Sequence, residues 1–409
     1  MTGTGTKMRP IRDTIPIEEA LALAMGASAP LNRTERIDLE ESVGRVLAVP
    51  VVADQDVPPF NRAAMDGYAV VADSTFGASR MEPSELECVE TVHTGSVPSK
   101  TLVSGQCTQV ATGAPMPDGA DAVVMVEETN RLDGDRVAIF TPVYPRQHVG
   151  RRGADITTGA QLLQPGDLLI PSRVGSIAAL GIDVIEVYAK PRVAILSTGN
   201  EIIAPGNPLG PGQIYDINRF TLGSVIREHG GVAVALPTAP DNLDELGKTV
   251  DACLEHDILV FSGGSSVGER DLTVDVIRLK GEILFHGIAV KPGKPTVFGT
   301  IGATPVLGMP GYPTSCLSNA YMLLVPVLRQ LARLPAHRFR SVTVPAAQRI
   351  VSTTGRHQFY TVRVVDGTAV AAFKASGDIT SMSQADGYIE IPAQTDIVEA
   401  GETVEVKLF

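Results

Sequence analysis

The sequence predicts a multidomain α/β protein whose largest part is a doubly wound, mostly parallel α/β domain. Three observations support this prediction. The chain has 409 residues, which is too long for one ordinary core. Between residues 190 and 335, short apolar runs alternate with helical patterns, as in a parallel sheet covered by helices. The other segments add a helical domain, an inserted β domain and a small C-terminal β-barrel to the predicted fold.

The first predicted domain is helical or mixed and is discontinuous, with residues 8–56 and 149–189. From residue 17 to residue 47 the apolar spacing is mostly helical, and EEALALAMG and LEESVGRVLA are each expected to form a helix. Residues 57–148 are expected to form the inserted β domain, because Pro-Pro and Asp-Gly turns there precede a series of short β-rich segments.

The α/β domain is expected at residues 190–335. VAILSTG and DILVFSGG are continuous apolar runs that end in glycine, as strands buried on both faces should be. A long apolar helix is expected from Thr314 to Leu334, with a kink at Pro326. Residues 336–409 contain strand-like segments such as FYTVRVV and TVEVKLF, which favour a small C-terminal β-barrel.

Composition excludes several classes of protein. Hydrophobic residues make up 44% of the chain and charged residues 20%, as in a folded globular protein, and the net charge of −12 argues against a nucleic-acid binder. No signal-like or membrane-spanning apolar stretch is recognisable. The four cysteines lie far apart without a C-x-x-C pair, which fits reduced thiols in a cytoplasm. We therefore expect a cytoplasmic protein without nucleic-acid or membrane partners.

Two glycine-rich loops follow the two buried strands. STGNE (197–201) and SGGSSVGERD (262–271) each combine small polar residues with a carboxylate. Ligands of open α/β sheets bind beyond the carboxyl ends of the strands, where glycine turns present backbone N–H groups to anions. Glu201 and Asp271 would suit Mg²⁺ beside a phosphate. The alternative is simple strand-to-helix punctuation, with Asp271 as an N-cap. The presence of both loops on one sheet favours a site.

The segment VKPGKP (290–295) holds Lys291 and Lys294 in a stiff context. Two close positive charges repel one another unless an anion lies between them, and lysine binds phosphate-like oxyanions well. The alternative is a solvated turn. GMPGYPTSC is similarly stiff and places Ser315 near a helix start, where N–H groups favour anions.

Three further residues are ambiguous from local pattern alone. Asp66 in MDGYAV lies in an Asp-Gly turn and Thr112 in TGAPMPDGADAVV lies in a similar turn, so each could serve the turn only. Asp241 precedes NLDEL and is well explained as a helix N-cap.

Eight segments in the same order together resemble the molybdopterin molybdenumtransferases of the MoeA type, over essentially the whole chain. They are PPFNRAAMDGYAV, ATGAPMPDGADAVV, RRGADI, STGNEI, GQIYDINR, SGGSSVGERD, KPGKP and MPGYP. The resemblance implies a helical domain, an inserted β domain, a molybdopterin-binding α/β domain and a C-terminal β domain. It also implies a homodimer with each active site between domains of different subunits.

The implied reaction is the last step of molybdenum cofactor assembly. Adenylylated molybdopterin and molybdate are the substrates, Mg²⁺ is the cofactor and AMP is released. The resemblance implies a catalytic set of Asp66, Thr112, Glu201, Asp241, Asp271, Lys291 and Lys294, with Glu201 and Asp271 near the metal. The expected substrate-binding residues are Ser197, Thr198, Gly199, Gly263, Gly264, Ser315 and Arg356.

Four positions depart from the family's usual pattern, namely Asn61, Ala63, Ser265 and Tyr312. Tyr312 replaces an asparagine beside the lysines, where it could narrow a molybdate pocket. Two rival functions stay open: a molybdopterin adenylyltransferase, which is typically the α/β domain alone, and a non-catalytic scaffold. The upstream adenylyltransferase is a candidate partner of the leading hypothesis.

Overall fold

A computed structural model describes residue 11 and residues 13–239, 242–263 and 272–409. The chain divides into two compact units, each of which is described by itself. The first contains residues 1–36, 44–46 and 186–409, and the second contains residues 37–43 and 47–185. Asp241, Gly264, Ser265 and Asp271 lie outside the described residues.

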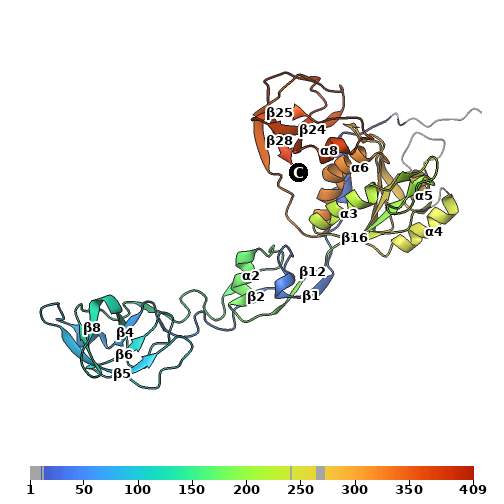
Figure 1. Ribbon diagram of the computed structural model, residues 1–409. Coiled ribbons are helices and arrows are strands. Elements are labelled where there is room, and N and C mark those ends of the chain that lie inside the picture. Colours follow the sequence, from blue (N-terminus) through green and yellow to red (C-terminus); the bar gives the residue numbers. More distant parts are fainter. Residues whose placement is uncertain (1–10, 12, 240–241, 264–271) are drawn as a thin grey trace, which may run out of the picture. The chain divides into compact units, whose positions relative to one another are not determined.

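The first unit contains a six-stranded α/β sheet in the order β16-β13-β17-β21-β20-β18. Its edge strand β16 is labelled in Figure 1. The strands are β13 (Arg192–Ser197), β16 (Val232–Ala235), β17 (Ile258–Ser262), β18 (Glu282–His286), β20 (Val297–Ile301) and β21 (Thr304–Met309). β16, β13, β17 and β21 pair in parallel, whereas β20 and β18 are antiparallel to their neighbours. The sheet is therefore mixed. Its parallel part includes β13 and β17, which are the two apolar runs that were predicted to be strands.

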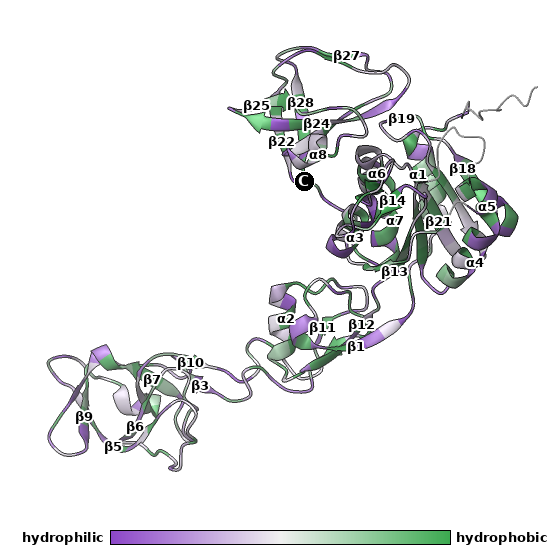
Figure 2. Cartoon of the chain, turned by 45° about the vertical axis from the view of Figure 1, so that its right-hand side comes forward, coloured by the Kyte–Doolittle hydropathy of each residue, from purple (hydrophilic) through white to green (hydrophobic). Residues whose placement is uncertain are grey.

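Helices cover both faces of this sheet. Alternate residues of β13 point to opposite sides, so that Val193 and Ile195 belong to one core cluster and Ala194 and Leu196 to the other. The first face packs against α1 (Ile17–Gly26), α3 (Asn218–Glu228), α6 (Pro313–Asn319) and α7 (Val325–Leu331), and the second against α4 (Leu243–Cys253) and α5 (Leu272–Lys280). β13 and β21, which are labelled in Figure 2, are accordingly mostly hydrophobic.

Of the two helices expected near the N-terminus, one forms and the other does not. α1 forms where a helix was expected and packs Ala20 and Ala24 into the core of the α/β unit, while the predicted domain bounds stay a prediction. The second expected helix, LEESVGRVLA, is only a single 3-10 turn, η1 (Leu39–Glu41). Gly44 has a φ of +81°, a left-handed conformation that ends the helical pattern.

The long apolar helix of the α/β domain is continuous but changes type. α6 runs directly into a π-helical turn, η4 (Ala320–Leu324), and then into α7. Pro326 follows the π turn. Proline has no N–H to donate to the carbonyl oxygen of the preceding turn, and the π turn lies where that hydrogen bond is missing. A kink at Pro326 stays a prediction.

The C-terminal part of the first unit is a second six-stranded sheet, in the order β19-β24-β26-β28-β22 with β25 on β24. Its strands are β19 (Val290–Lys291), β22 (Ser341–Pro345), β24 (His357–Val365), β25 (Thr368–Ala371), β26 (Gly387–Ile391) and β28 (Thr403–Leu408), with a separate pair β23 (Ile350–Val351) and β27 (Ile397–Val398) and the short helix α8 (Thr380–Ser383). An isolated bridge between Ala346 and Ala369 links the region after β22 to β25. A closed barrel stays a prediction.

The second unit contains a six-stranded sheet in the order β7-β4-β6-β5-β9-β8. Its strands are β4 (Gly67–Val70), β5 (Ser84–Val92), β6 (Gln106–Val110), β7 (Ala122–Met125), β8 (Thr129–Arg131) and β9 (Arg136–Ile139). The two units also contain shorter elements outside these sheets. They are β1 (Thr34–Asp38), β2 (Val51–Val52), β3 (Arg62–Ala63), β10 (Val149–Gly150), β11 (Gln161–Leu163), β12 (Val184–Tyr188), β14 (Ile202–Ile203), β15 (Ile214–Tyr215), α2 (Pro171–Ala178), η2 (Ala72–Thr75) and η3 (Val126–Glu128).

In its coarser form the predicted fold class is confirmed, because the chain is a multidomain α/β protein. None of the helices in the described part of the chain has the length and hydropathy that a membrane span needs.

Candidate active site

Three strands of the α/β sheet end side by side. Ser197 of β13 pairs with Ser262 of β17, which pairs with Met309 of β21. The loop that follows each strand therefore begins at the same edge of the sheet, as expected for the carboxyl ends of parallel strands. We call this edge the strand-end site.

Glycine is required where two of these loops meet. Gly263 has a φ of +100°, and a Cβ placed on it would lie 2.7 Å from the carbonyl oxygen of Thr198. Gly311, after β21, also approaches it, since a Cβ there would lie 3.6 Å from the Gly263 Cα. The backbone thus packs closely enough to present its N–H groups to a ligand without intervening side chains.

A buried carboxylate supports the strand-end site. Asp216 is 5% exposed and accepts a hydrogen bond of 2.6 Å from the Ser197 hydroxyl and one of 3.0 Å from the backbone N–H of Arg219. Asp216 therefore fixes the Ser197 side chain and the start of α3. It lies in GQIYDINR, one of the family segments, but no role was predicted for it from the sequence.

Two buried polar atoms at this edge have no hydrogen-bond partner among the described residues: Thr198 Oγ1 and Asn218 Oδ1. Asn218 donates its amide hydrogen to the carbonyl oxygen of Gly311 at 2.8 Å, which leaves its Oδ1 as the spare acceptor. Buried polar groups are nearly always satisfied, so such atoms indicate where a ligand could bind.

Glu201 has the chemistry of a metal ligand. The φ of Gly199 is +132°, and a Cβ on that glycine would lie 2.6 Å from Glu201 Oε2, so the carboxylate lies directly over the loop. Glu201 is exposed, and hard carboxylate oxygens suit Mg²⁺. Its expected partner Asp271 lies outside the described residues, and among those described there is no cluster of three or more histidine, cysteine, aspartate or glutamate side chains that could hold a metal ion. Glu201 therefore offers one exposed carboxylate at this edge.

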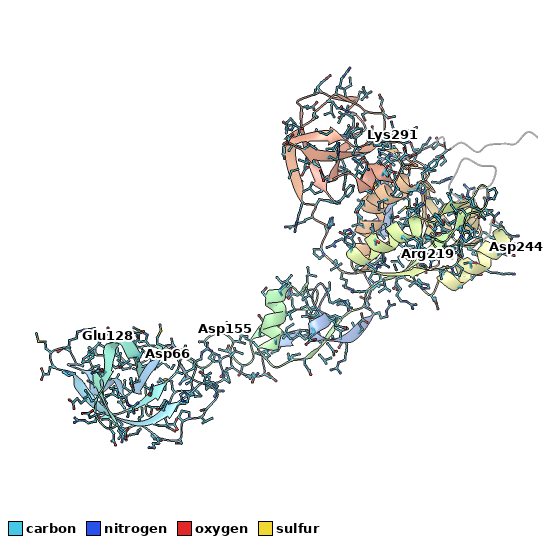
Figure 3. The ribbon with its side chains drawn as sticks, in the orientation of Figure 1. Asp66, Glu128, Asp155, Arg219, Asp244 and Lys291 are labelled. Carbon is cyan, nitrogen blue, oxygen red and sulfur yellow. The ribbon has the colours of Figure 1, made fainter. Side chains whose placement is uncertain are left out.

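The lysine loop, residues 291–295, lies at the same edge of the sheet. It precedes β20, whose first residue Val297 pairs with Gly308, next to the end of β21. Lys291 Nζ donates to the Thr353 hydroxyl at 2.8 Å and lies 6.0 Å from the centre of the Phe373 ring. Lys294 Nζ donates to the carbonyl oxygen of Ile11 at 2.6 Å. Both lysines are partly buried (Lys291 is labelled in Figure 3).

One buried amide holds this loop. Asn319 is fully buried, and its Nδ2 donates to the Gly293 carbonyl at 2.9 Å and to the Thr296 hydroxyl at 2.5 Å. Gly293 has a φ of +107°, and a Cβ on it would lie 2.4 Å from the Asn319 amide. Sequence reasoning missed Asn319, although it follows Ser315 by one helical turn.

The C-terminal sheet brings Arg356 beside the lysine loop. β19 pairs in parallel with β24, so that Val290 lies opposite His357, the residue after Arg356. Ser315 is buried within α6. Tyr312 is 65% exposed, and a Cβ on Gly377 would lie 3.7 Å from its ring, so this ring lies against the C-terminal sheet domain.

Asp66 and Thr112 meet in the second unit (Asp66 is labelled in Figure 3). Asp66 Oδ1 accepts hydrogen bonds from the Thr112 backbone N–H at 2.6 Å and from its hydroxyl at 2.9 Å. The backbone N–H, and then the hydroxyl, hold the pKa of Asp66 below its usual value. Asp66 is exposed, so the pair presents an ionised carboxylate to solvent.

Comparison with known proteins defines the class. Family models match residues 15–181 as the MoeA N-terminal region (domain I and II), 194–330 as a probable molybdopterin binding domain, and 343–409 as the MoeA C-terminal region (domain IV). The chain is thus a protein built around an α/β domain of the molybdopterin-binding type.

Individual relatives extend over the whole chain. A molybdopterin molybdenumtransferase 2 of Mycobacterium tuberculosis is 33% identical, covering 95% of this chain and 97% of that protein. A putative molybdopterin biosynthesis protein of Methanocaldococcus jannaschii is 32% identical over 98% of this chain and 100% of its own length. The crystal structure of the molybdopterin biosynthesis MoeA protein of Pyrococcus horikoshii matches with a TM-score of 0.84 and 39% identity, covering 97% of this chain and 99% of that one. The chain belongs to the MoeA-type molybdopterin molybdenumtransferase family of molybdenum cofactor biosynthesis.

Proposed function

We propose that this protein inserts molybdenum from molybdate into adenylylated molybdopterin, with release of AMP, as the last step of molybdenum cofactor assembly. The observation that carries the proposal is the meeting of glycine turns, an exposed carboxylate and two lysines at one edge of the α/β sheet. Such an edge offers N–H groups to phosphate, an oxygen ligand to a metal and positive charge to an oxyanion. We also propose that the α/β domain is doubly wound and that the C-terminal domain is a small β-barrel, as expected from the sequence.

Substrate binding is assigned to the glycine turns and their neighbours. The backbone at Gly199 and Gly263 would hold the phosphates, while Thr198 Oγ1 and Asn218 Oδ1 supply spare hydrogen-bonding positions for the ligand. Ser197, fixed by Asp216, stands at the same edge. Gly264, Asp241 and Asp271 retain the roles that the resemblance implies.

Molybdate is assigned to the lysine loop. Lys291 and Lys294 would bind the oxyanion, with Arg356 and Ser315 beside them, because compact ammonium groups match a small dianion. The Tyr312 ring, which lies in the same stiff segment as α6, would then set the width of the pocket.

Mg²⁺ is assigned to Glu201, together with Asp271. When bound, the metal would neutralise charge that develops on the pyrophosphate's leaving oxygen. Glu201 would hold it against the loop at Gly199, so removal of the carboxylate should weaken the dependence of turnover on Mg²⁺.

The proposal also includes a cytoplasmic homodimer in which Asp66 and Thr112 of one subunit complete the site of the other. The upstream adenylyltransferase is the proposed partner that supplies the substrate. An adenylylated, highly charged intermediate is best passed on within the compartment where it is made.

The test is incubation of the protein with adenylylated molybdopterin and Mg²⁺, with and without molybdate, followed by measurement of AMP. The proposal predicts AMP release that requires molybdate. Synthesis of the adenylylated compound from ATP would instead indicate the adenylyltransferase. Absence of both reactions in a folded protein would favour the scaffold.

A further inference from the structure

Two of the four cysteines lie opposite one another on neighbouring strands of the second unit. Cys88 of β5 pairs in register with Cys107 of β6, and these strands run parallel. Neighbouring strands are about 4.8 Å apart, which falls within the Cα separation that a disulfide bond requires. Both side chains belong to one hydrophobic cluster and therefore project from the same face of the sheet.

The surroundings make the two sulfurs unequal. Cys88 Sγ donates to the carbonyl oxygen of Glu90 at 3.5 Å. A hydrogen bond from the neighbouring Cys107 thiol lowers the pKa of Cys88 to about 6, against burial, which raises it. The same hydrogen bond, and then burial, raise the pKa of Cys107. Cys88 is 7% exposed and Cys107 is fully buried. Cys88 is therefore the more readily ionised and the more accessible of the two sulfurs, and the Cys107 thiol lies beside it.

We propose that Cys88 and Cys107 are a redox modification site, which a peroxide converts into a disulfide bond between β5 and β6. The Cys88 thiolate attacks an oxygen of hydrogen peroxide, the O–O bond breaks, and Cys88 becomes a sulfenic acid, while the leaving hydroxide takes up the proton that Cys88 released and departs as water. The Cys107 sulfur then attacks the Cys88 sulfur, the S–O bond breaks, and the leaving hydroxide takes the Cys107 proton and departs as a second water. The two thiols lose two electrons and the peroxide gains them.

The other two cysteines provide an internal comparison. Cys253 donates its S–H to the Thr249 carbonyl within α4, and burial raises its pKa to about 11. Burial also raises the pKa of Cys316, which lies on α6 and is fully buried. Both should remain thiols under conditions that oxidise the strand pair.

The experiment treats the reduced full-length protein with a small molar excess of hydrogen peroxide. Free thiols are then alkylated in denaturant, and the peptides are mapped without reduction. The expected product is a linked peptide pair containing Cys88 and Cys107, with two of the four thiols lost and both recovered on addition of a thiol reductant. Alkylation of all four cysteines after peroxide treatment would overturn the proposal, as would a linkage that involves Cys253 or Cys316.

Two variants separate the steps. In Cys107→Ser the sulfenic acid cannot close into a disulfide, so a dione probe should label Cys88. Cys253→Ser should form the same linked peptide as the unaltered chain. Failure of the dione to label Cys88 in a folded Cys107→Ser protein would also contradict the proposal.

Discussion

Asn319 is a buried residue that holds the lysine loop. Its amide satisfies the Gly293 carbonyl and the Thr296 hydroxyl, and its position excludes any side chain at residue 293. The buried amide therefore helps to fix the loop that carries Lys291 and Lys294.

Asn319→Leu, which keeps the branched shape of the side chain but removes its amide, should lower the free energy of unfolding by about 1–3 kcal/mol, because buried hydrogen-bonding groups lose their partner. It should also raise the KM for molybdate by a larger factor than it lowers kcat, because the loop that it displaces binds molybdate. Chemical denaturation and molybdate titration measure the two effects. Asn207→Ala, at an exposed position, is the control. An unchanged KM would remove Asn319 from loop positioning.

Asp66 and Thr112 allow a prediction about pH. Because the folded-state pKa of Asp66 is lowered, its bond to Thr112 contributes stability above the unfolded pKa and loses it as the pH falls through the folded pKa. Thr112→Val removes the hydroxyl but keeps the backbone N–H, so the pKa of Asp66 should rise only part of the way to its usual value.

Carboxyl-carbon NMR measures this pKa. Asp56 is the matched control, since its pKa is lowered by the Thr158 backbone N–H, by Arg152 and by the Thr158 hydroxyl in a similar arrangement. It should not change in Thr112→Val. An unchanged Asp66 pKa would show that the hydroxyl has no electrostatic effect.

Sequence patterns predicted residues at the ends of strands better than residues that contact them from elsewhere. Ser197 and Gly263 could be placed because each lies at the end of an apolar run. Asp216 and Asn319 were missed because their contacts span 19 and 26 residues, and no local pattern encodes such a distance. Asp66 and Thr112 were chosen by resemblance, and their mutual hydrogen bonds join positions 46 residues apart.

Among the elements, the buried strands were predicted well and the N-terminal helices less well. Continuous apolar runs can be satisfied only by burial on both faces, which β13 and β17 achieve. LEESVGRVLA also has helical spacing, but two features prevent a longer helix there. One is Gly44, and the other is hydrogen bonding to a segment far away in the sequence, since the Leu39 N–H donates to the carbonyl oxygen of Asp183. Local periodicity carries no information about such long-range contacts.

The short strand β19 places Lys291 beside the C-terminal sheet, which leads to a test of its charge. Lys291→Met should keep the fold and raise the KM for molybdate by at least about tenfold, the loss expected for a charged hydrogen bond. Lys280→Met is the control, because Lys280 forms an ion pair with Asp251 on helices α4 and α5 of the same unit. Equal molybdate dependence in both variants would exclude Lys291 from the site.

For the whole molecule, the multidomain α/β class was predictable from length and from the changes in pattern along the chain. The mixed character of the α/β sheet was not, because β20 and β18 resemble parallel strands in composition and only their pairing shows their direction.

A site shared between subunits predicts complementation. Asp66→Asn and Lys291→Met alter different units, so a mixed dimer would contain one intact site, and random exchange should restore about one quarter of the unaltered activity. Mixing Lys291→Met with Glu201→Gln, which alter the same unit, should restore none. Equal results in the two mixtures would argue against a shared site.

The most direct measurement is the molybdenum bound to pterin per AMP released, determined by elemental analysis of the isolated product. The proposed function predicts a ratio near one, with both products absent when molybdate is omitted. AMP released without molybdenum in the product would contradict it.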